Sequence, residues 1–183
     1  GGMVFAADVG VRARIRQMRS HGMTTTSWER SKGHAFSYDV PELGFNYRME
    51  GVQGAILRVK LRHLDAWTEA RRRHAAFYSE LLSGVAVQRP VEMPYAKHVY
   101  HVYSIRTPKR DQMQEALQTK GIQTGIHYPI PVHLQKAYAD FGYGVGALPV
   151  TEQAASELLS LPMFAELENG QIEAVCAAVR EAL

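Results

Sequence analysis

The chain has 183 residues, of which 46% are hydrophobic and 21% charged, a balance typical of soluble globular proteins. It contains no apolar run near the roughly 20 residues that a membrane-spanning helix needs, so no membrane is expected as a partner. No basic and then apolar leader opens the chain, and its one cysteine, Cys176, cannot form an internal disulfide. These features predict a protein of the reducing cytoplasm.

The net charge is +3, and arginines cluster at residues 12–19 and 71–73. Dense positive charge can bind the phosphates of nucleic acids. The alternative is a solvated helix face whose charge is balanced by nearby acidic residues, such as Asp65, Glu69 and Glu80. Neither cluster has the interleaved aromatic residues of a nucleic-acid module, so we expect no nucleic acid as a partner.

In chain order, the first predicted elements are a short apolar strand at residues 3–6 and a helix over residues 8–21. Apolar residues recur on one face of this helix, and arginines occupy the other. A long polar segment follows at residues 23–43. Loops of this length inside a compact domain tend to be functional or disordered.

The longest periodic stretch, residues 50–83, predicts one helix, because its apolar residues fall at steps of three and four. A helix of about 30 residues is about 45 Å long, which is too long for one small compact domain. We therefore expect this helix to link two domains, with a bend near residues 64–67.

The remainder of the chain changes to an alternation of strands and helices. Strands are expected at residues 99–105 and 122–128, and helices at 110–120, 135–141, 151–160 and 168–183. Two or three strands covered by helices predict a small α/β domain.

Four histidines that lie close in sequence raise the hypothesis of a metal site: His98, His101, His127 and His133. A metal site needs convergent ligands, often at positions i and i+4 of one helix. His98 and His101 lie at the edge of a strand and would point to opposite faces. No cysteines or carboxylates cluster with the histidines, so we expect no metal.

His127 and Tyr128 end a predicted strand and precede Pro129 and Pro131, which restrict the backbone. His133 follows closely. Polar side chains held on a stiff loop suit the binding of a polyhydroxylated or phosphorylated ligand. The alternative is a packed turn in which His127 and Tyr128 hydrogen-bond to backbone carbonyls.

Asn46 and Arg48 lie in a turn before the long helix. An amide and a guanidinium group are donors well suited to the oxygens of a phosphate or diphosphate. A helix that begins near Met49 would add a favourable dipole for an anion. Any junction between a loop and a helix can look like this, so the pair alone does not define a site.

Several blocks of sequence, in one order along nearly the whole chain, resemble the DegT/DnrJ/StrS family of nucleotide-sugar aminotransferases. They are residues 18–24, 33–34, 38–40, 43–49, 71–73, 100–103, 121–129 and 159–163. Members of this family are pyridoxal-phosphate (PLP) enzymes of fold type I that work as homodimers. The resemblance therefore implies an α/β fold that is the C-terminal part of such a transferase.

The resemblance also implies a division into domains. Residues 1–60 would be the C-terminal remnant of the large PLP-binding domain. Residues 61–183 would form the long linking helix and a small C-terminal α/β domain. The activity implied is amino transfer from an amino acid, with glutamate as the expected donor, to a keto-sugar nucleotide.

Five residues acquire roles by the same resemblance. Asn46 resembles the asparagine that reaches the PLP phosphate of the partner subunit's site, and Arg48 the arginine that helps to bind substrate there. His127 and Tyr128 match the pair that approaches the sugar-nucleotide across the dimer interface. His133, a neighbour of this pair, is also assigned to substrate binding.

The Schiff-base lysine of the family lies shortly upstream of the position that matches Gly1. None of the lysines in this chain has its context, so we expect no catalytic residue here and no turnover by this chain alone. Two alternatives to the transaminase remain open. One is a non-catalytic relative that binds sugar-nucleotides or a protein partner, and the other is a small α/β nucleic-acid binder.

Overall fold

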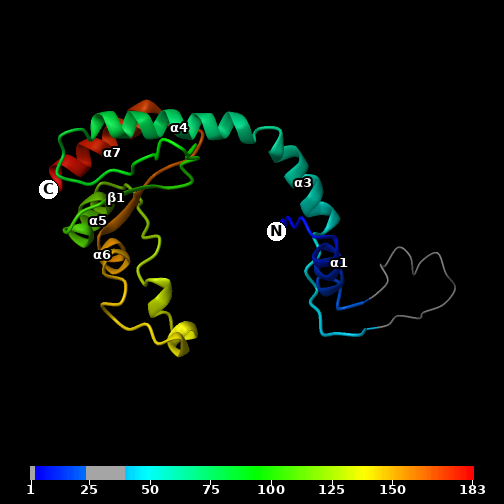
Figure 1. Cartoon of the computed structure of the whole chain (residues 1–183). Helices are drawn as coiled ribbons and strands as arrows, with labels where there is room; N and C mark the ends of the chain where they lie inside the picture. Colours follow the sequence, from blue (N-terminus) through cyan, green and yellow to red (C-terminus); the bar gives the residue numbers. More distant parts are fainter. Residues whose placement is uncertain (1–2, 24–39) are drawn as a thin grey trace. The chain divides into compact units, whose positions relative to one another are not determined.

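The computed structural model of the chain describes residues 3–23 and 40–183 (Figure 1). Most of the long polar segment predicted from the sequence, residues 24–39, lies outside the described residues. The chain divides into two compact units, Gly1–Arg62 and His63–Leu183, each with its own set of elements.

The first unit contains helices α1 (Val9–Met18) and α3 (Gly51–Leu61). The first helix begins where the sequence predicted, because Asp8 caps it: its Oδ1 accepts a hydrogen bond from the Val11 N–H at 2.8 Å. The strand predicted at residues 3–6 was wrong. A strand needs a partner for its backbone groups, and no described segment pairs with these residues.

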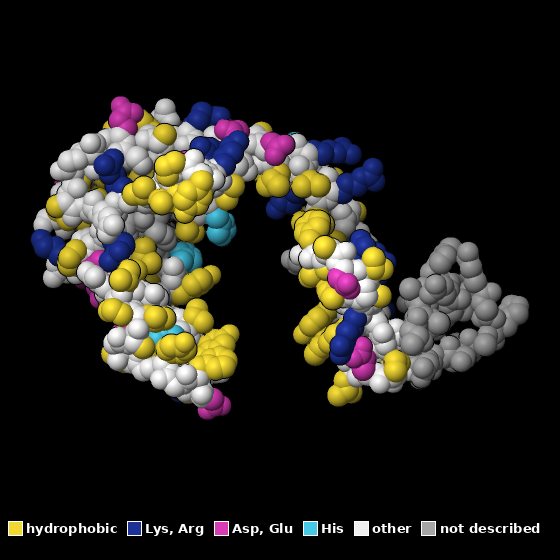
Figure 2. Space-filling view, in the orientation of Figure 1, with side chains coloured by type: hydrophobic (Ala, Val, Ile, Leu, Met, Phe, Trp, Pro, Cys, Tyr) yellow, Lys and Arg dark blue, Asp and Glu magenta, His cyan; other side chains and the backbone are white. Residues whose placement is uncertain are grey.

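Apolar side chains of the first unit lie largely at its surface. Neither α1 nor α3 has a buried residue. The exposed apolar side chains of α3 are those of Val52, Ile56, Leu57, Val59 and Leu61. Figure 2 shows hydrophobic side chains at the surface of this part of the chain. Among its described residues the unit therefore has no hydrophobic core of its own.

The helix predicted over residues 50–83, with a bend near residues 64–67, is two helices, α3 and α4 (Leu64–Leu81), with the interruption at Arg62 and His63. At the end of α3 the Arg62 N–H bonds to the Val59 carbonyl at 3.2 Å, the tighter spacing that ends many helices. The next α-type bond runs from the Trp67 N–H to the His63 carbonyl at 3.0 Å. Neither proline nor glycine marks this interruption.

The second unit is built on a two-stranded antiparallel sheet of β1 (Tyr103–Arg106) and β2 (Leu158–Leu161). Ser104 of β1 lies directly opposite Ser160 of β2. Gly125 pairs with Ser160 through two backbone hydrogen bonds of 2.7 and 3.0 Å. Three segments that are distant in sequence therefore meet at Ser160.

The strands differ from those predicted. The strand expected over residues 99–105 begins only at Tyr103, because Tyr100 has a left-handed φ of 47° that a strand does not accommodate. The strand expected over 122–128 is reduced to the single bridge at Gly125.

The helices of the second unit agree better with the sequence. They are α5 (Arg110–Thr119), η1 (Val132–Leu134), η2 (Lys136–Phe141), α6 (Pro149–Glu157) and α7 (Asn169–Glu181), the two η elements being 3-10 helices. The helix predicted over residues 151–160 was wrong at its end, since β2 begins at Leu158. None of the helices in the described ranges combines the length and apolar composition of a membrane span.

A hydrophobic core closes within the second unit. Helices α4 and α5 both pack against α7, and α5 and α6 contact the sheet. The largest fully buried side chains are those of Tyr78, Leu82, Tyr103, Ile105, Met113, Leu117, Leu159, Ile172 and Val179. Cys176 lies in the same core, and burial raises the pKa of its thiol to about 11.

Replacing Val179 by Ala tests the contribution of this core. The side chain is 0% exposed, so its loss should lower the free energy of unfolding by about 2 kcal/mol through lost burial and an unfilled cavity. Val145→Ala removes the same atoms from a residue that is 87% exposed and should change stability by less than about 0.5 kcal/mol. Urea unfolding of both variants provides the measurement; equal losses would contradict the assigned core.

Candidate functional site

The segment that carries Asn46 and Arg48 is attached to the end of α1 by backbone hydrogen bonds. The Phe45 N–H donates to the Met18 carbonyl at 2.6 Å, and the Phe45 carbonyl accepts from the His21 N–H at 2.8 Å. The Tyr47 N–H donates to the Arg19 carbonyl at 2.9 Å. These bonds hold the segment in an extended conformation beside the helix end.

Two glycines make this close approach possible. A Cβ added to Gly44 would lie 2.0 Å from the Gly22 nitrogen, and one added to Gly22 would lie 1.9 Å from the Glu42 carbonyl oxygen. Gly22 also has a φ of +73°, which favours glycine. Because backbone atoms cannot move aside as a side chain can, both positions require glycine.

Asn46 and Arg48 share one side of the extended segment. The rings of Phe45 and Tyr47 stack at 5.0 Å with an interplanar angle of 6°, so these alternate residues lie together. Alternation then places Asn46 and Arg48 on the opposite side. Both are exposed, and neither side chain has a polar partner among the described residues. An amide and a guanidinium group thus lie on one side of the segment.

The helix dipole contributes less here than the sequence predicted. Helix α3 begins at Gly51, and its N-terminal cap is Glu50, whose N–H donates to Gln53 Oε1 at 3.1 Å. A carboxylate of the chain itself thus stands at the positive end of the dipole. Anion binding by this segment would rest on Asn46 and Arg48.

In the second unit, His127 lies over Gly125. A Cβ added to Gly125 would be 2.7 Å from His127 Cε1 and 3.3 Å from Nδ1, so the ring occupies the space that a side chain would fill. His127 Nδ1 is 3.0 Å from Ser160 Oγ, which is itself 2.7 Å from Ser104 Oγ. The imidazole is therefore held by a short chain of two serine hydroxyls.

The neighbouring side chain, Tyr128, is 73% exposed. Its ring meets that of His127 edge-on, with the ring centres 5.5 Å apart. Neither side chain hydrogen-bonds to a backbone carbonyl within the described ranges, so the alternative of a packed turn satisfied in that way is wrong for these residues. The structure brings the predicted pair together with polar atoms at the surface.

His133 lies apart from this pair. It is 8% exposed, and its Nε2 is 3.1 Å from Glu152 Oε1. Glu152 also accepts hydrogen bonds from the backbone N–H groups of Gly146, at 2.8 and 3.0 Å, and of Leu148, at 3.1 Å. These contacts, first that of Gly146, lower the pKa of Glu152. The pair joins η1 to the first turn of α6 and to the loop before it.

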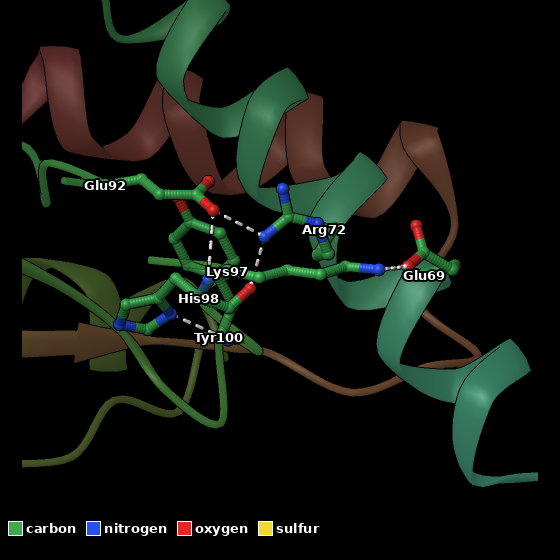
Figure 3. A network of polar contacts seen from close by, with 6 residues as sticks. All are labelled: Glu69, Arg72, Glu92, Lys97, His98 and Tyr100. Carbon is green, nitrogen blue, oxygen red and sulfur yellow. Dashed lines mark hydrogen bonds and ion pairs between the residues drawn. The ribbon is translucent and has the colours of Figure 1, made fainter. Parts of the chain in front are cut away.

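The arginines at residues 71–73 do not form an open basic patch. Arg71 Nη1 donates to the carbonyls of His101 at 3.1 Å and Met163 at 2.9 Å. Arg72 Nη1 is 2.8 Å from Glu92 Oε1 and 2.5 Å from the His98 carbonyl (Figure 3). Two of the three guanidinium groups are thus used within the fold, which leaves less positive charge for a nucleic acid.

The same network holds the segment before β1. Glu92 accepts from Arg72 and, at 2.9 Å, from the His98 N–H, and these bonds lower the pKa of its carboxyl group. Lys97 forms a second ion pair with Glu69 of α4 at 2.6 Å. No group of three potential metal ligands occurs among the residues that the structure describes.

The sequence analysis missed three residues of the site, Ser104, Gly125 and Ser160. They are close only because of the sheet, since 56 positions separate the two serines. The glycine, just before the predicted His-Tyr pair, is the one signal that pointed to a close approach.

The described elements have the α/β fold of the C-terminal part of a fold-type I transferase, which confirms the predicted fold class. S. venezuelae DesV, solved in complex with a ketimine intermediate, matches 95% of the chain with a TM-score of 0.82 and 36% identity, over 44% of its own length. A Brucella abortus aminotransferase named for DegT, DnrJ, EryC1 and StrS matches 97% of the chain with a TM-score of 0.82 and 33% identity, over 44% of its length.

The chain belongs to the DegT/DnrJ/EryC1/StrS aminotransferase family, whose sequence profile matches residues 1–180. The predicted family is thereby confirmed. A pleiotropic regulatory protein of Geobacillus stearothermophilus is 44% identical over 99% of the chain, which covers 46% of that protein. A UDP-N-acetyl-3-dehydro-alpha-D-glucosamine 3-aminotransferase of Acidithiobacillus ferrooxidans is 38% identical over 100% of the chain and 46% of its own length. The chain thus spans about half the length of these relatives.

Gly125→Ala should displace the His127 ring. The new Cβ cannot coexist with the imidazole carbon 2.7 Å away, so the ring must rotate and leave Ser160. Because the obstacle is the end of a side chain, we expect a loss of only about 1 kcal/mol in the free energy of unfolding. Histidine NMR signals should shift for His127 alone. Gly144→Ala, which meets no atom within 4 Å, should leave them unchanged.

Glu152→Gln should make the stability of the chain less dependent on pH. A lowered pKa means that ionised Glu152 stabilises the fold above the ordinary glutamate pKa of about 4.3, and that this stabilisation is lost as the pH falls through the lower folded value. Urea unfolding at several pH values provides the measurement. The difference in urea midpoint between the wild-type chain and the variant should be largest near pH 7 and should shrink at lower pH. Glu173→Gln, on the exposed side of α7, is the matched control for charge; an equal effect there would contradict the role of Glu152.

Proposed function

We propose that the chain is the C-terminal part of an aminotransferase that moves an amino group from an amino acid, with glutamate as the expected donor, to a keto-sugar nucleotide. The observation that carries this proposal is the agreement over nearly the whole chain with proteins named as aminotransferases of nucleotide sugars. In this proposal residues 1–60 complete the large domain, and residues 61–183 form the linking helical segment and the small domain.

Asn46 and Arg48 fit a phosphorylated cofactor and substrate chemically. Both side chains are hydrogen-bond donors, and neither bonds to an acceptor among the described residues. They share one side of a segment held by backbone bonds. We assign Asn46 to the PLP phosphate and Arg48 to the substrate. When bound, PLP supplies the electron sink for breaking bonds at the amino-bearing carbon. Asn46 and Arg48 would bind and orient the cofactor and the substrate.

His127 and Tyr128 are assigned to the sugar-nucleotide. Their polar atoms are presented at the surface of the second unit, and His127 is held in place by Ser160. His133 was predicted to bind substrate as well and stays a candidate for that role. Its buried contact with Glu152 supports a role in holding the turn after the pair, since a ligand would have to compete with a carboxylate for Nε2.

The proposal includes a homodimer in the cytoplasm, with these residues contributed across the interface. The exposed apolar side chains of α3 support a contact surface of this kind, because large apolar patches commonly mark interfaces. The proposal also holds that the Schiff-base lysine is not among the residues of this chain. The 183-residue chain alone should then show no transaminase turnover.

A second function deserves a test, because the Geobacillus relative is named a pleiotropic regulatory protein and not a transaminase. A non-catalytic relative would bind a sugar-nucleotide or a protein partner without turning substrate over. Reading the coding DNA before Gly1 separates the two functions. An in-frame extension with a lysine shortly before Gly1 supports the transaminase, whereas a replaced lysine supports the binding protein.

In the full-length protein, Arg48→Ala should raise the KM for the keto-sugar nucleotide about 10- to 100-fold, the cost of a lost hydrogen bond from a charged group. Steady-state kinetics with glutamate as donor provides the measurement. Arg58→Ala, at an exposed arginine in the last turn of α3, removes the same charge and should leave the KM within twofold of the wild-type value. An unchanged KM in Arg48→Ala would refute its assignment.

A further inference from the structure

The hydroxyl groups of Ser104 and Ser160 lie on β1 and β2, where the two residues are direct cross-strand partners. The backbone N–H and carbonyl of Ser160 both bond to Gly125, so the two serines form a pair without mutual backbone hydrogen bonds. Side chains approach most closely in such pairs, which agrees with the 2.7 Å between the two Oγ atoms. The contact therefore follows from the sheet register.

The number of protons on the two hydroxyl groups and the His127 imidazole indicates which group donates each hydrogen bond. Each serine has one hydroxyl proton, and a neutral imidazole has one donor and one acceptor nitrogen. If Ser104 donates to Ser160, then Ser160 donates to His127 Nδ1, and both hydroxyl protons have acceptors. In the reverse direction Nδ1 donates to Ser160 and the proton of the half-buried Ser104 is left to solvent, so only the first direction gives both hydroxyl protons acceptors within the fold. Ser160 is 4% exposed, so water competes little for its hydroxyl.

We propose that Ser104 and Ser160 are positioning residues that make Nδ1 of His127 an acceptor and so place the imidazole proton on Nε2. The ring itself is located by its contact with Gly125. His127 is exposed, and its Nε2 has no partner among the residues described. It is thus presented as a fixed donor to an oxygen atom of a ligand. The role toward a sugar-nucleotide rests on the proposed function, but the state of the ring does not.

The test is the tautomer of His127 in the 183-residue chain, read from long-range proton–nitrogen NMR spectra at about pH 8, where an ordinary histidine is neutral. His127→Gln identifies the signals. The wild-type chain should show Nε2–H, with Nδ1 shifted as a hydrogen-bond acceptor. Ser160→Ala should abolish that shift and raise the Nδ1–H population several-fold. Ser104→Ala, which leaves the Ser160 contact in place, should raise it less.

Ser156→Ala is the control. Its hydroxyl donates to the Gln153 carbonyl of its own helix, at 2.8 Å, so the His127 signals should not change. Thermal unfolding shows whether each variant is folded. If Ser160→Ala does not fold, the tautomer of His127 in Ser104→Ala decides the test. A wild-type Nδ1–H tautomer, or serine variants with wild-type spectra, would overturn the proposal.

A kinetic measurement in the full-length protein separates this inference from the proposed function. Ser160→Ala should raise the KM for the keto-sugar nucleotide about fivefold and leave kcat within twofold, the effect of one lost neutral hydrogen bond. A rise in KM without a change of tautomer would overturn the positioning role. Absence of transaminase activity in the wild-type protein would refute the proposed function, while the NMR result would still decide the state of His127.

Discussion

The pairing of β1 with β2 is the contact on which the second unit and its surface site depend. It places Ser104 opposite Ser160, and the free edge of β2 then receives Gly125 through two backbone hydrogen bonds. Ser104, Ser160 and Gly125 therefore lie side by side in a row across three segments. The imidazole of His127 lies over Gly125, at the end of this row. A shift of one residue in this register would turn Ser160 to the other face and remove the support of the histidine.

The two units reach their conformations by different means. The second unit buries a continuous set of aromatic and aliphatic side chains between its helices and sheet. The first unit has no such set among its described residues and is held by backbone bonds at the end of α1 and by the approach of Gly22 to Gly44. The segment that carries Asn46 and Arg48 is therefore held chiefly by main-chain contacts.

Local patterns predicted the elements whose contacts are local. Helices α5 and α7 lie at the expected residues, because the apolar periodicity of a helix and its capping residues are found within one short stretch of sequence. Residues 158–160 were assigned to the end of a helix, since Leu-Leu-Ser fits either state and only pairing with β1 makes it a strand. A bend was expected near residues 64–67, and the interruption lies slightly earlier, at Arg62 and His63, because no proline or glycine fixes its position.

By itself the sequence determined the family, the α/β class and the identity of the polar residues at the two candidate segments, because motifs and periodicity are properties of short stretches. Tertiary structure decided how those residues are used. It separated His133, buried against Glu152, from His127, and it supplied two serines that no motif had indicated. The reason is physical: hydrogen bonds between side chains depend on strand register and close approach, and these arise only when distant segments pack together.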